Sequence, residues 1–260
     1  MINRTNMILR QAESWRPLAF RADSGTLSRV HFALRRFLDL QTASIWQDLR
    51  RELPRVEGAV VDVGCGAQPW RPLFGPAAVY KGIDTADARE NFDYEVPDTL
   101  YYEGSVWPLA DASADFILCT ETLEHVPETK PFLAQAARCL TPGGRLLLTV
   151  PFAARWHYIP HDYWRFTPSS LHALLTEAGF GDVAVYARGN EVTVACYKAM
   201  ALLLPLLVPR GKNPLLGMAA RLLGLLLSPL LILLAAIGNL SLRGKGGDDC
   251  LGYTALARKL

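Results

Sequence analysis

The stretch Val60-Val61-Asp62-Val63-Gly64-Cys65-Gly66-Ala67-Gln68 decides the fold of this chain. Its apolar run, which begins at Ala59 and ends at Val63, is typical of a parallel β-strand that is buried on both faces. Gly64 and Gly66 then allow a tight turn and a close approach of the backbone to a ligand, which a Cβ atom would block. The stretch therefore predicts a buried strand that presents its backbone to a nucleotide-like ligand.

An acidic residue at the end of the next apolar run supports this interpretation. Asp84 lies 18 residues after Gly66 and follows Val79-Tyr80-Lys81-Gly82-Ile83. In a nucleotide-binding βαβ unit, a carboxylate at about this distance binds the hydroxyls of a ribose. The two segments together predict a site for a ribose-containing ligand.

Composition narrows the class of protein. The 260 residues are 50% hydrophobic, which is enough for a sizeable core, and we expect one α/β domain with additions. With 27 basic and 25 acidic residues, the formal net charge of +2 disfavours a nucleic-acid partner.

The five cysteines are odd in number and include no C-x-x-C pair, so we expect buried thiols in a reducing compartment. The N-terminal residues lack the apolar core of a secretory signal, so we expect a cytoplasmic location.

Short apolar runs alternate with helical segments through the middle of the chain. The predicted strands are 59–63, 79–83, 99–104, 115–120, 145–151 and 182–187. Helices are predicted over 131–140 and 169–178, and a turn over 141–144. The segment 24–53 is predicted as one long helix or a broken pair. This alternation predicts an α/β fold with a doubly wound, mostly parallel sheet.

Five motifs in order resemble those of the class I S-adenosylmethionine-dependent methyltransferases, particularly the bacterial small-molecule branch. They are Asp62-Val63-Gly64-Cys65-Gly66, Asp84 after Lys81-Gly82-Ile83, Glu103-Gly104-Ser105-Val106, the run from Ala114 to Val126, and Leu140-Thr141-Pro142-Gly143-Gly144-Arg145-Leu146. The resemblance covers roughly positions 56–190 and the final ten residues, where Leu251 to Arg258 is similar to the family's last, antiparallel strand. It implies a Rossmann-like methyltransferase fold and S-adenosyl-L-methionine as the cofactor.

The resemblance also implies which residues bind that cofactor. In the family, the glycine loop wraps the methionine part, the acid after the second strand holds both ribose hydroxyls, and a segment after the third strand lies against the adenine. Ser105 stands where the family more commonly has Asp. The implied cofactor-binding residues are Asp62, Gly64, Cys65, Gly66, Asp84, Gly104, Ser105, Val106, Thr120 and Glu121.

The glycine loop fits a dinucleotide less well. Pro69 occupies the position of the third glycine of a dinucleotide fingerprint, and the loop has no P-loop lysine. An NAD(P)-dependent oxidoreductase and a non-catalytic, membrane-anchored cofactor-binding protein remain the alternatives.

Histidines and aromatic residues cluster between Trp156 and Phe166, just after the fifth strand. An open α/β sheet presents the carboxyl ends of its strands to substrate. A hydroxyl acceptor needs a base, and His161, beside Asp162, or the equally placed His157 could take a proton near neutral pH. The same segment could instead be a structural lead-in to the next helix, with backbone carbonyls satisfying the histidines.

We expect further side chains near this cluster to contact the acceptor. The predicted substrate-binding residues are His125, Tyr158, Tyr163 and Trp164. No metal site is predicted, because Pro160 interrupts the pair formed by His157 and His161 and no third ligand is evident.

The segment 192–249 is strongly apolar and includes the uncharged run Leu222 to Leu242, whose 21 residues would suffice to cross a bilayer. Because both flanks belong to one predicted sheet, the chain would have to cross twice or not at all. Two crossings would translocate Arg210 and Lys212, against the positive-inside rule. We favour a helical hairpin over 199–242 that lies in the cytoplasmic face of the membrane, with a two-pass hairpin or a pair packed on protein as alternatives.

The predicted organisation has three parts. They are an N-terminal helical extension (1–55), a Rossmann-like methyltransferase domain (56–191 plus 250–260) and an apolar, membrane-associated insertion (192–249). An enzyme held at a bilayer meets lipophilic compounds most readily. The sequence therefore predicts a small-molecule, lipophilic or lipid-linked acceptor and no nucleic-acid partner.

Overall fold

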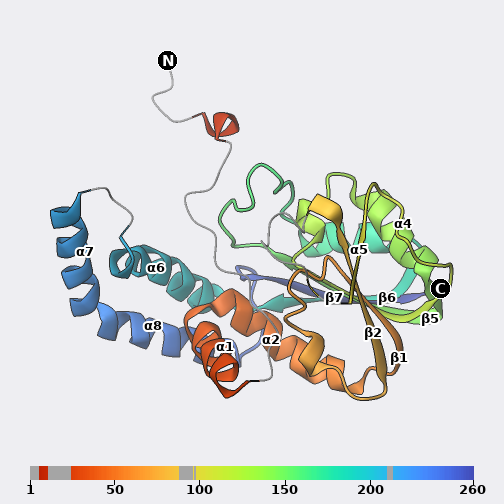
Figure 1. The fold of residues 1–260 in the computed structure, drawn as a ribbon, viewed down its shortest axis with the longest axis horizontal. Helices are drawn as coiled ribbons and strands as arrows, with labels where there is room; N and C mark the ends of the chain where they lie inside the picture. Colours follow the sequence, from red (N-terminus) through yellow and green to blue (C-terminus); the bar gives the residue numbers. More distant parts are fainter. Residues whose placement is uncertain (1–5, 11–24, 88–95, 97, 210–212) are drawn as a thin grey trace. The chain divides into compact units, whose positions relative to one another are not determined.

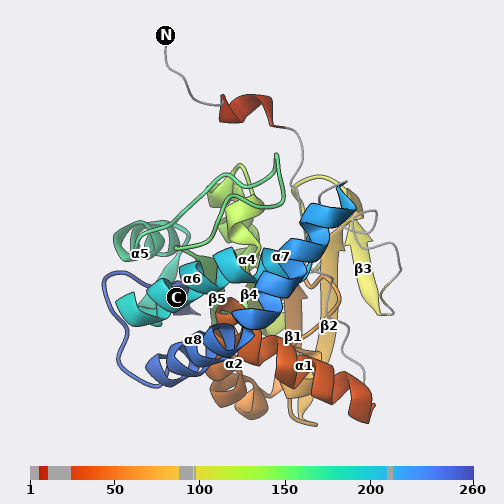
Figure 2. The ribbon, with the colours of Figure 1, turned by 90° about the vertical axis from the view of Figure 1, so that its left-hand side faces the viewer.

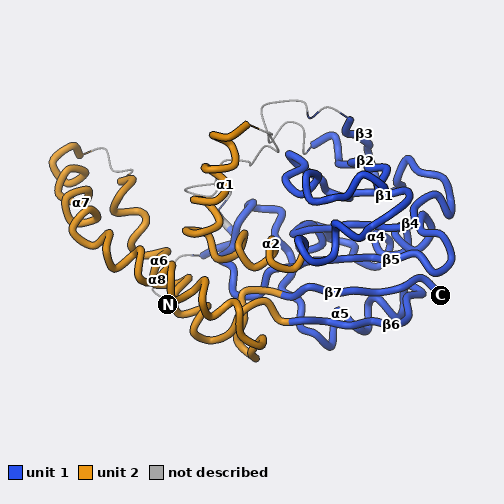
Figure 3. Tube along the Cα trace, turned by 90° about the horizontal axis from the view of Figure 1, so that it is seen from below, with its two compact units in different colours: residues 1–23, 49–186, 253–260 blue, residues 24–48, 187–252 orange. Residues whose placement is uncertain are grey.

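The computed structural model describes residues 6–10, 25–87, 96, 98–209 and 213–260. The chain forms two compact units, which Figure 3 colours separately. Unit 1 comprises Met1–Asp23, Leu49–Tyr186 and Tyr253–Leu260, and unit 2 comprises Ser24–Asp48 and Ala187–Gly252. Arg210 and Lys212, on which the argument about membrane crossing depends, lie outside the described residues.

A seven-stranded sheet is the framework of unit 1 (Figure 1). Its strands are β1 (Gly58–Val63), β2 (Ala78–Thr85), β3 (Thr99–Tyr102), β4 (Ala114–Thr120), β5 (Leu140–Pro151), β6 (Phe180–Arg188) and β7 (Gly252–Lys259). Their order across the sheet is β3-β2-β1-β4-β5-β7-β6. Strand order reverses beside β1, where doubly wound sheets bind ligands. The predicted fold class is confirmed.

Strand directions follow from the pairings. β1 runs parallel to β2 and β4, β2 runs parallel to β3, and β4 runs parallel to β5. At the start of β7, the Tyr253 ring lies 5.4 Å from that of Phe152, just beyond the end of β5. At its other end, Lys259 Nζ donates to the carbonyl of Leu140, the first residue of β5, at 2.6 Å. β7 therefore runs antiparallel to β5.

The predicted turn at 141–144 belongs to β5. Leu140 already pairs with Ala114, and the regular register resumes where Arg145 pairs with Phe116. The four residues between them form a bulge, with Gly143 at a φ of +75°. The turn residues therefore lie inside β5 and not before it, because Leu140, which precedes them, already pairs with β4.

The two predicted helices of unit 1, 131–140 and 169–178, form with bounds that differ from the prediction by one or two residues. α4 (Thr129–Cys139) and α5 (Pro168–Glu177) lie together on one side of the sheet, as Figures 1 and 2 show. Thr167 and Ser170 form a capping box at the start of α5, and Gly179, at a φ of +92°, follows its end. Short 3-10 turns are η1 (Met7–Leu9), η2 (Leu53–Arg55), η3 (Arg71–Leu73) and η4 (Leu123–His125).

Apolar strand residues form the core of unit 1. The strands β1, β4 and β5 bury most of their residues, as expected for a sheet covered on both faces. The largest fully buried side chains of the unit include Trp107, Phe116, Ile117, Leu118, Leu123, Leu133 and Phe180. All five cysteines are buried free thiols, as predicted.

Unit 2 is built mainly from helices. They are α1 (Thr26–Leu38), the first part of α2 (Leu40–Glu52), α6 (Glu191–Leu207), α7 (Pro214–Leu226) and α8 (Ser228–Ser241). The predicted segment 24–53 is the broken pair: Asp39 lies between α1 and α2 and accepts hydrogen bonds from the backbone of Gln41 and Thr42. Asp39 therefore caps α2, which explains the break.

Close helix packing in unit 2 involves Gly224 and Gly238. A Cβ at Gly238 of α8 would lie 2.5 Å from Leu40 and 3.3 Å from Cys196 of α6, and one at Gly224 would lie 2.9 Å from the backbone of α6. The Asn239 side chain donates to the Phe37 carbonyl at 2.9 Å and so ties α8 to α1. Unit 2 thus joins segments about 200 residues apart.

The uncharged run 222–242 is not one helix. Leu227 separates α7 from α8, and a proline occupies the first turn of α8. Among the described residues, no single helix is long and apolar enough to span a membrane, whereas α7 and α8, bent by 53°, pass that test as a pair. Both helices expose many large apolar side chains: Leu215, Leu216, Met218, Leu222, Leu223, Leu225, Leu226, Leu230, Ile232, Leu233, Ile237 and Leu240.

Candidate functional site

The glycine loop follows β1 directly. Gly64 and Gly66 have φ angles of +67° and +49°, which side chains with a Cβ rarely adopt. A Cβ on Gly64 would also lie 2.4 Å from the Thr122 side chain, so Gly64 is required by a close approach within the protein itself. The Gly64 N–H donates to the Ile83 carbonyl at 2.9 Å, which holds the loop against the end of β2.

Asp84 joins this loop from the neighbouring strand. One carboxylate oxygen accepts from the Gly66 N–H at 2.8 Å and the other accepts from the Thr85 N–H at 2.8 Å. Burial raises the pKa of Asp84, and the two N–H donors oppose that rise. Each carboxylate oxygen has further acceptor capacity, which suits a pair of ribose hydroxyls.

Asp62, in β1, is almost fully buried behind the loop. It accepts from the Tyr80 hydroxyl at 2.7 Å, while its second oxygen has no hydrogen-bond partner among the described residues. Burial raises the pKa of Asp62 to about 7, and the Tyr80 hydroxyl counteracts part of this rise. The second Asp62 oxygen is a buried hydrogen-bond acceptor without a donor among the described residues. It fits a cationic cofactor such as S-adenosylmethionine, whose positive charge would compensate the buried carboxylate.

The remaining residues implied for the cofactor lie at the same end of the sheet. Gly104, Ser105 and Val106 are exposed just after β3. Thr120 ends β4 and pairs with Thr149, whose hydroxyl donates to a Glu121 carboxylate oxygen at 3.0 Å. The structure therefore gathers the predicted residues at the carboxyl ends of β1 to β4, while their contacts with the cofactor stay a prediction.

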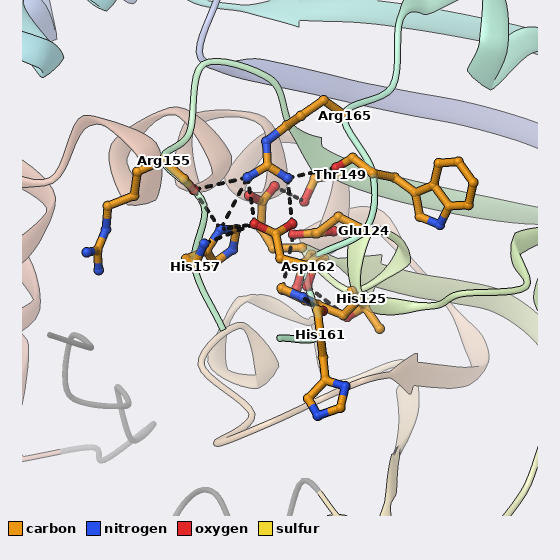
Figure 4. A network of polar contacts seen from close by, with 12 residues as sticks. Glu124, His125, Thr149, Arg155, His157, His161, Asp162 and Arg165 are labelled. Carbon is orange, nitrogen blue, oxygen red and sulfur yellow. Dashed lines mark hydrogen bonds and ion pairs between the residues drawn. The ribbon is translucent and has the colours of Figure 1, made fainter. Parts of the chain in front are cut away.

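A second polar group follows β4 and β5 (Figure 4). Glu124, in η4, is fully buried, and neither carboxylate oxygen has a hydrogen-bond partner among the described residues. His125 Nε2 lies 3.7 Å from Oε1 of Glu124. Burial raises the pKa of Glu124 and lowers that of His125 to about 4. This arrangement leaves a buried carboxyl group without a hydrogen-bond partner among the described residues.

His157 completes this group. Its ring lies 5.0 Å from the His125 ring, and one donor atom from each of Glu124, His125 and His157 lies within 4.8 Å of the others. The Nδ1 atom of His157 lies 3.0 Å from an Asp162 oxygen and 3.0 Å from the Arg155 carbonyl. The structure thus pairs Asp162 with His157, whereas the sequence argument had paired it with His161.

Arg165 holds Asp162 in place. Its two terminal nitrogens donate to the two Asp162 oxygens at 2.6 and 2.8 Å, a bidentate geometry. Partial burial raises the pKa of Asp162, but the Arg165 and His157 donors outweigh it, so the pKa lies well below its usual range. Asp162 is therefore a charged acceptor that orients His157.

The other predicted acceptor-binding side chains surround this group. The Tyr158 ring lies 5.0 Å from the His125 ring, and the indole of Trp164 donates to the Val126 carbonyl at 2.9 Å. Tyr163 is about half exposed, and its hydroxyl lies 3.3 Å from Nδ1 of His161. The exposed His161 ring points away from the group in Figure 4, although its carbonyl accepts from Nδ1 of His125 at 2.6 Å.

The sequence alone did not reveal three features of this group. They are Glu124, Arg165 and the pairing of Asp162 with His157. The only sequence signal was the adjacency of Glu124 and His125 after the fourth strand. The pair formed by His157 and His161, on which the prediction of no metal rested, is not the grouping that forms. His157 meets His125 and Glu124 instead.

Comparison with known proteins identifies the family. The model of the methyltransferase domain matches residues 34–185, more than half of the chain. The chain is 36% identical over 95 residues to the ubiquinone biosynthesis O-methyltransferase of Paracidovorax citrulli, a match that covers 33% of this chain and 40% of that protein. It is 28% identical over 164 residues to the protein of the same name from Thiobacillus denitrificans, covering 52% and 68%.

Two further similarities agree. The 27-O-demethylrifamycin SV methyltransferase of Amycolatopsis mediterranei is 31% identical over 124 residues, covering 43% of this chain and 45% of that one. A solved S-adenosylmethionine-dependent methyltransferase from Archaeoglobus fulgidus shares the fold with a TM-score of 0.51 at 18% identity, covering 88% and 99%. The chain therefore belongs to the family of S-adenosylmethionine-dependent methyltransferase domains.

Proposed function

We propose that this protein transfers a methyl group from S-adenosylmethionine to a hydroxyl oxygen of a small, lipophilic acceptor at the inner face of the cell membrane. The observation that carries the proposal is the group of Glu124, His125 and His157 beyond β4 and β5, at the same end of the sheet as the glycine loop. Polar groups at this edge can receive an acceptor next to the methyl donor.

The reaction has simple requirements. When bound, S-adenosylmethionine supplies an electrophilic methyl carbon on a sulfonium. The methyl group would pass to the acceptor oxygen with release of S-adenosylhomocysteine, so this chain's residues would have to position that oxygen and accept its proton. Alignment and exclusion of water supply most of the rate. Asp84 and the glycine loop would orient the cofactor, and the group of Glu124, His125 and His157 would orient the acceptor oxygen and help it lose its proton.

The names of the relatives support an oxygen acceptor. The proteins from Paracidovorax citrulli and Thiobacillus denitrificans are named O-methyltransferases of ubiquinone biosynthesis. The Amycolatopsis relative is named for the methylation of a 27-O-demethyl compound. The matches cover only 40 to 68% of the lengths of these three proteins. The acceptor of this chain is therefore proposed here and is not taken over from the relatives.

The apolar surface of α7 and α8 supports a lipophilic acceptor and contact with the membrane. Leu222 and Leu226 are 63 and 74% exposed, and their neighbours on these helices are also apolar. Exposed apolar surfaces of this kind mark sites of protein or membrane contact. A helical pair that lies in the cytoplasmic leaflet would accommodate them.

Transfer of a radiolabelled methyl group to a bacterial lipid extract tests the proposal. We expect label in the organic phase with the wild type and none with Asp84→Ala. Label confined to the aqueous phase would contradict a lipophilic acceptor. Binding of NAD(H) but not S-adenosylhomocysteine in calorimetry would favour the oxidoreductase alternative, and cofactor binding without any transfer would favour the non-catalytic one.

A further inference from the structure

We propose that a cavity in unit 2 binds the phosphate headgroup of an anionic phospholipid through Arg36 and Arg243. The cavity lies between α1, α2 and α8, which are side by side in Figures 1 and 2. The site stands on the residues that line this cavity, and its use at a membrane rests on the proposed function.

The cavity is large enough for a headgroup and is built into the fold of unit 2. Its volume is about 540 Å³, which is in the range of small-molecule sites. Aromatic and aliphatic side chains line it, among them Trp46 and Leu240, together with the two arginines. At its edge the Asn239 side chain donates to the Phe37 carbonyl at 2.9 Å and holds α8 against α1.

The charge of the lining indicates an anion. Arg36 and Arg243 both line the cavity, and none of the other described residues that line it is charged. Guanidinium groups bind phosphate through paired N–H donors, and the amide of Gln47 in the lining adds donors of its own. The cavity is therefore complementary to a phosphate group.

Aromatic rings fix the position of the Arg36 guanidinium. Its Cζ atom lies 3.6 Å from the centroid of the Trp46 ring and 5.1 Å from that of the Phe32 ring. Stacking uses the face of a guanidinium and not its edge, where the N–H donors lie. Arg36 is thus ordered before a ligand arrives, which lowers the entropy cost of binding.

Apolar side chains beside the arginines favour a lipid over a soluble anion. Leu233, Ala236 and Leu240 follow one another on α8 at helical spacing, and Arg243 comes three residues after Leu240. Leu233 and Leu240 are 54 and 64% exposed, although Leu240 also lines the cavity. An acyl chain that covers these side chains would bring its phosphate to Arg243. The apolar row and the cationic cavity together match an anionic amphiphile.

Calorimetric titration of the full-length protein with dihexanoylphosphatidylglycerol below its critical micelle concentration tests the site, because this lipid is then a soluble monomer. We expect one lipid per chain for the wild type. Binding to Arg36→Gln/Arg243→Gln should be at least tenfold weaker, because each arginine contributes a charge-assisted contact. Absence of binding to the wild type, or equal binding to this variant, would overturn the site.

A matched control removes the same charge outside the cavity. Arg29 on α1 and Arg221 on α7 are exposed and do not line the cavity. Arg29→Gln/Arg221→Gln should therefore bind the lipid like the wild type. An equal loss of affinity in the control would mean that net charge and not the cavity attracts the lipid, which would also overturn the site.

Two further titrations identify the chemistry that the cavity recognises. Dihexanoylphosphatidylcholine has no net charge and inorganic phosphate has no acyl chain, so each should bind at least tenfold more weakly than the phosphatidylglycerol. Equal binding of the phosphatidylcholine would overturn the preference for an anionic lipid. Equal binding of inorganic phosphate would overturn the lipid in favour of a free phosphate.

Tryptophan fluorescence keeps the test informative if the arginine variant is unstable. Lipid bound beside Trp46 should change the emission of the wild type. Trp46→Phe keeps an aromatic ring under Arg36 and should remove most of that change. An emission change that Trp46→Phe leaves intact would place the lipid elsewhere and overturn the site.

Vesicle flotation separates this site from the proposed function. If the soluble lipid binds at the cavity but the protein does not float with phosphatidylglycerol vesicles, the membrane contact fails and the lipid site stands. If flotation requires Leu222 and Leu226 but neither Arg36 nor Arg243, the membrane contact stands and the site is overturned.

Discussion

One carboxylate oxygen of Asp84 accepts a hydrogen bond from the backbone N–H of Gly66 at 2.8 Å. This contact joins the acid at the end of β2 to the loop after β1, so the residue expected to bind ribose also shapes the loop expected to bind methionine. The two parts of the cofactor site are therefore structurally coupled.

Asp84→Ala should weaken binding of S-adenosylhomocysteine at least tenfold, because hydrogen bonds to a charged group contribute roughly 1.5–3 kcal/mol. Calorimetry measures the dissociation constant. The exposed Asp182→Asn is the control, since Asn tolerates the positive φ of that position. Unchanged affinity in Asp84→Ala would exclude Asp84 from the site.

Gly64→Ala should destabilise the protein by roughly 2–4 kcal/mol. The left-handed backbone contributes about 1–2 kcal/mol and the contact with Thr122 contributes the rest. Gly104→Ala is a matched control with a φ of +77° and no atom within 4 Å of the new Cβ. It should therefore lose only the stability that the left-handed backbone costs. Chemical denaturation measures both variants, and an equal loss in both would show that Thr122 does not crowd the loop.

The buried Asp62 should make stability fall as pH rises. Its pKa is about 7 in the folded protein against an ordinary value of 3.8, so between these values the folded state holds one proton more than the unfolded state. The unfolding free energy should then decrease by about 1.4 kcal/mol per pH unit from about pH 4 to pH 7. Asp62→Asn should remove that part of the slope in denaturation curves measured across this range. An unchanged slope would mean that Asp62 is already ionised at low pH.

Arg165→Lys should reduce turnover about 10- to 100-fold while cofactor binding stays unchanged. Lysine keeps the charge but cannot form the bidentate contact that holds Asp162 against His157. Initial rates and calorimetry on the same preparations check this, with the exposed Arg145→Lys as control. Parallel losses of turnover and cofactor affinity would instead indicate a general structural defect.

Leu222→Glu/Leu226→Glu should weaken binding to phosphatidylglycerol-containing vesicles by more than tenfold. Burial of each leucine in a membrane contributes roughly 1.5–3 kcal/mol, which a charged side chain removes. Vesicle flotation measures the bound fraction, and Val79→Glu, at a 72% exposed apolar position of β2, is the control. Wild-type protein that does not float with vesicles would contradict the membrane contact.

Much of the fold could be predicted because its signals are local. The apolar run before Gly64 specifies a strand. The Thr167 cap specifies the start of a helix, and Gly179 specifies the end of the same helix, each within a few residues. The bulge at 141–144 could not be predicted, since whether Leu140 pairs before or after the turn depends on β4. The break at Leu227 was missed because the uncharged composition of 222–242 outweighed the proline signal at the start of α8.

The candidate site was predictable only in part. Gly66 and Asp84 follow strands directly, so their meeting at one edge of the sheet follows from the fold. Asp162 lies beside His161 in sequence but contacts His157, because the turn between them reverses the chain. The burial of Glu124 without a hydrogen-bond partner depends on η4 and the segment after β5, and no local pattern carries that information.

The acceptor atom is the most direct test of the account. Incubation of the protein with S-adenosylmethionine carrying a ¹³C-labelled methyl group and a bacterial lipid extract, followed by ¹³C NMR of the organic phase, identifies the atom that is methylated. We predict a single new methoxy resonance that is absent with Asp84→Ala. A labelled methyl group on nitrogen or carbon would contradict the proposed methylation at oxygen. So would the absence of any labelled product from protein that binds S-adenosylhomocysteine.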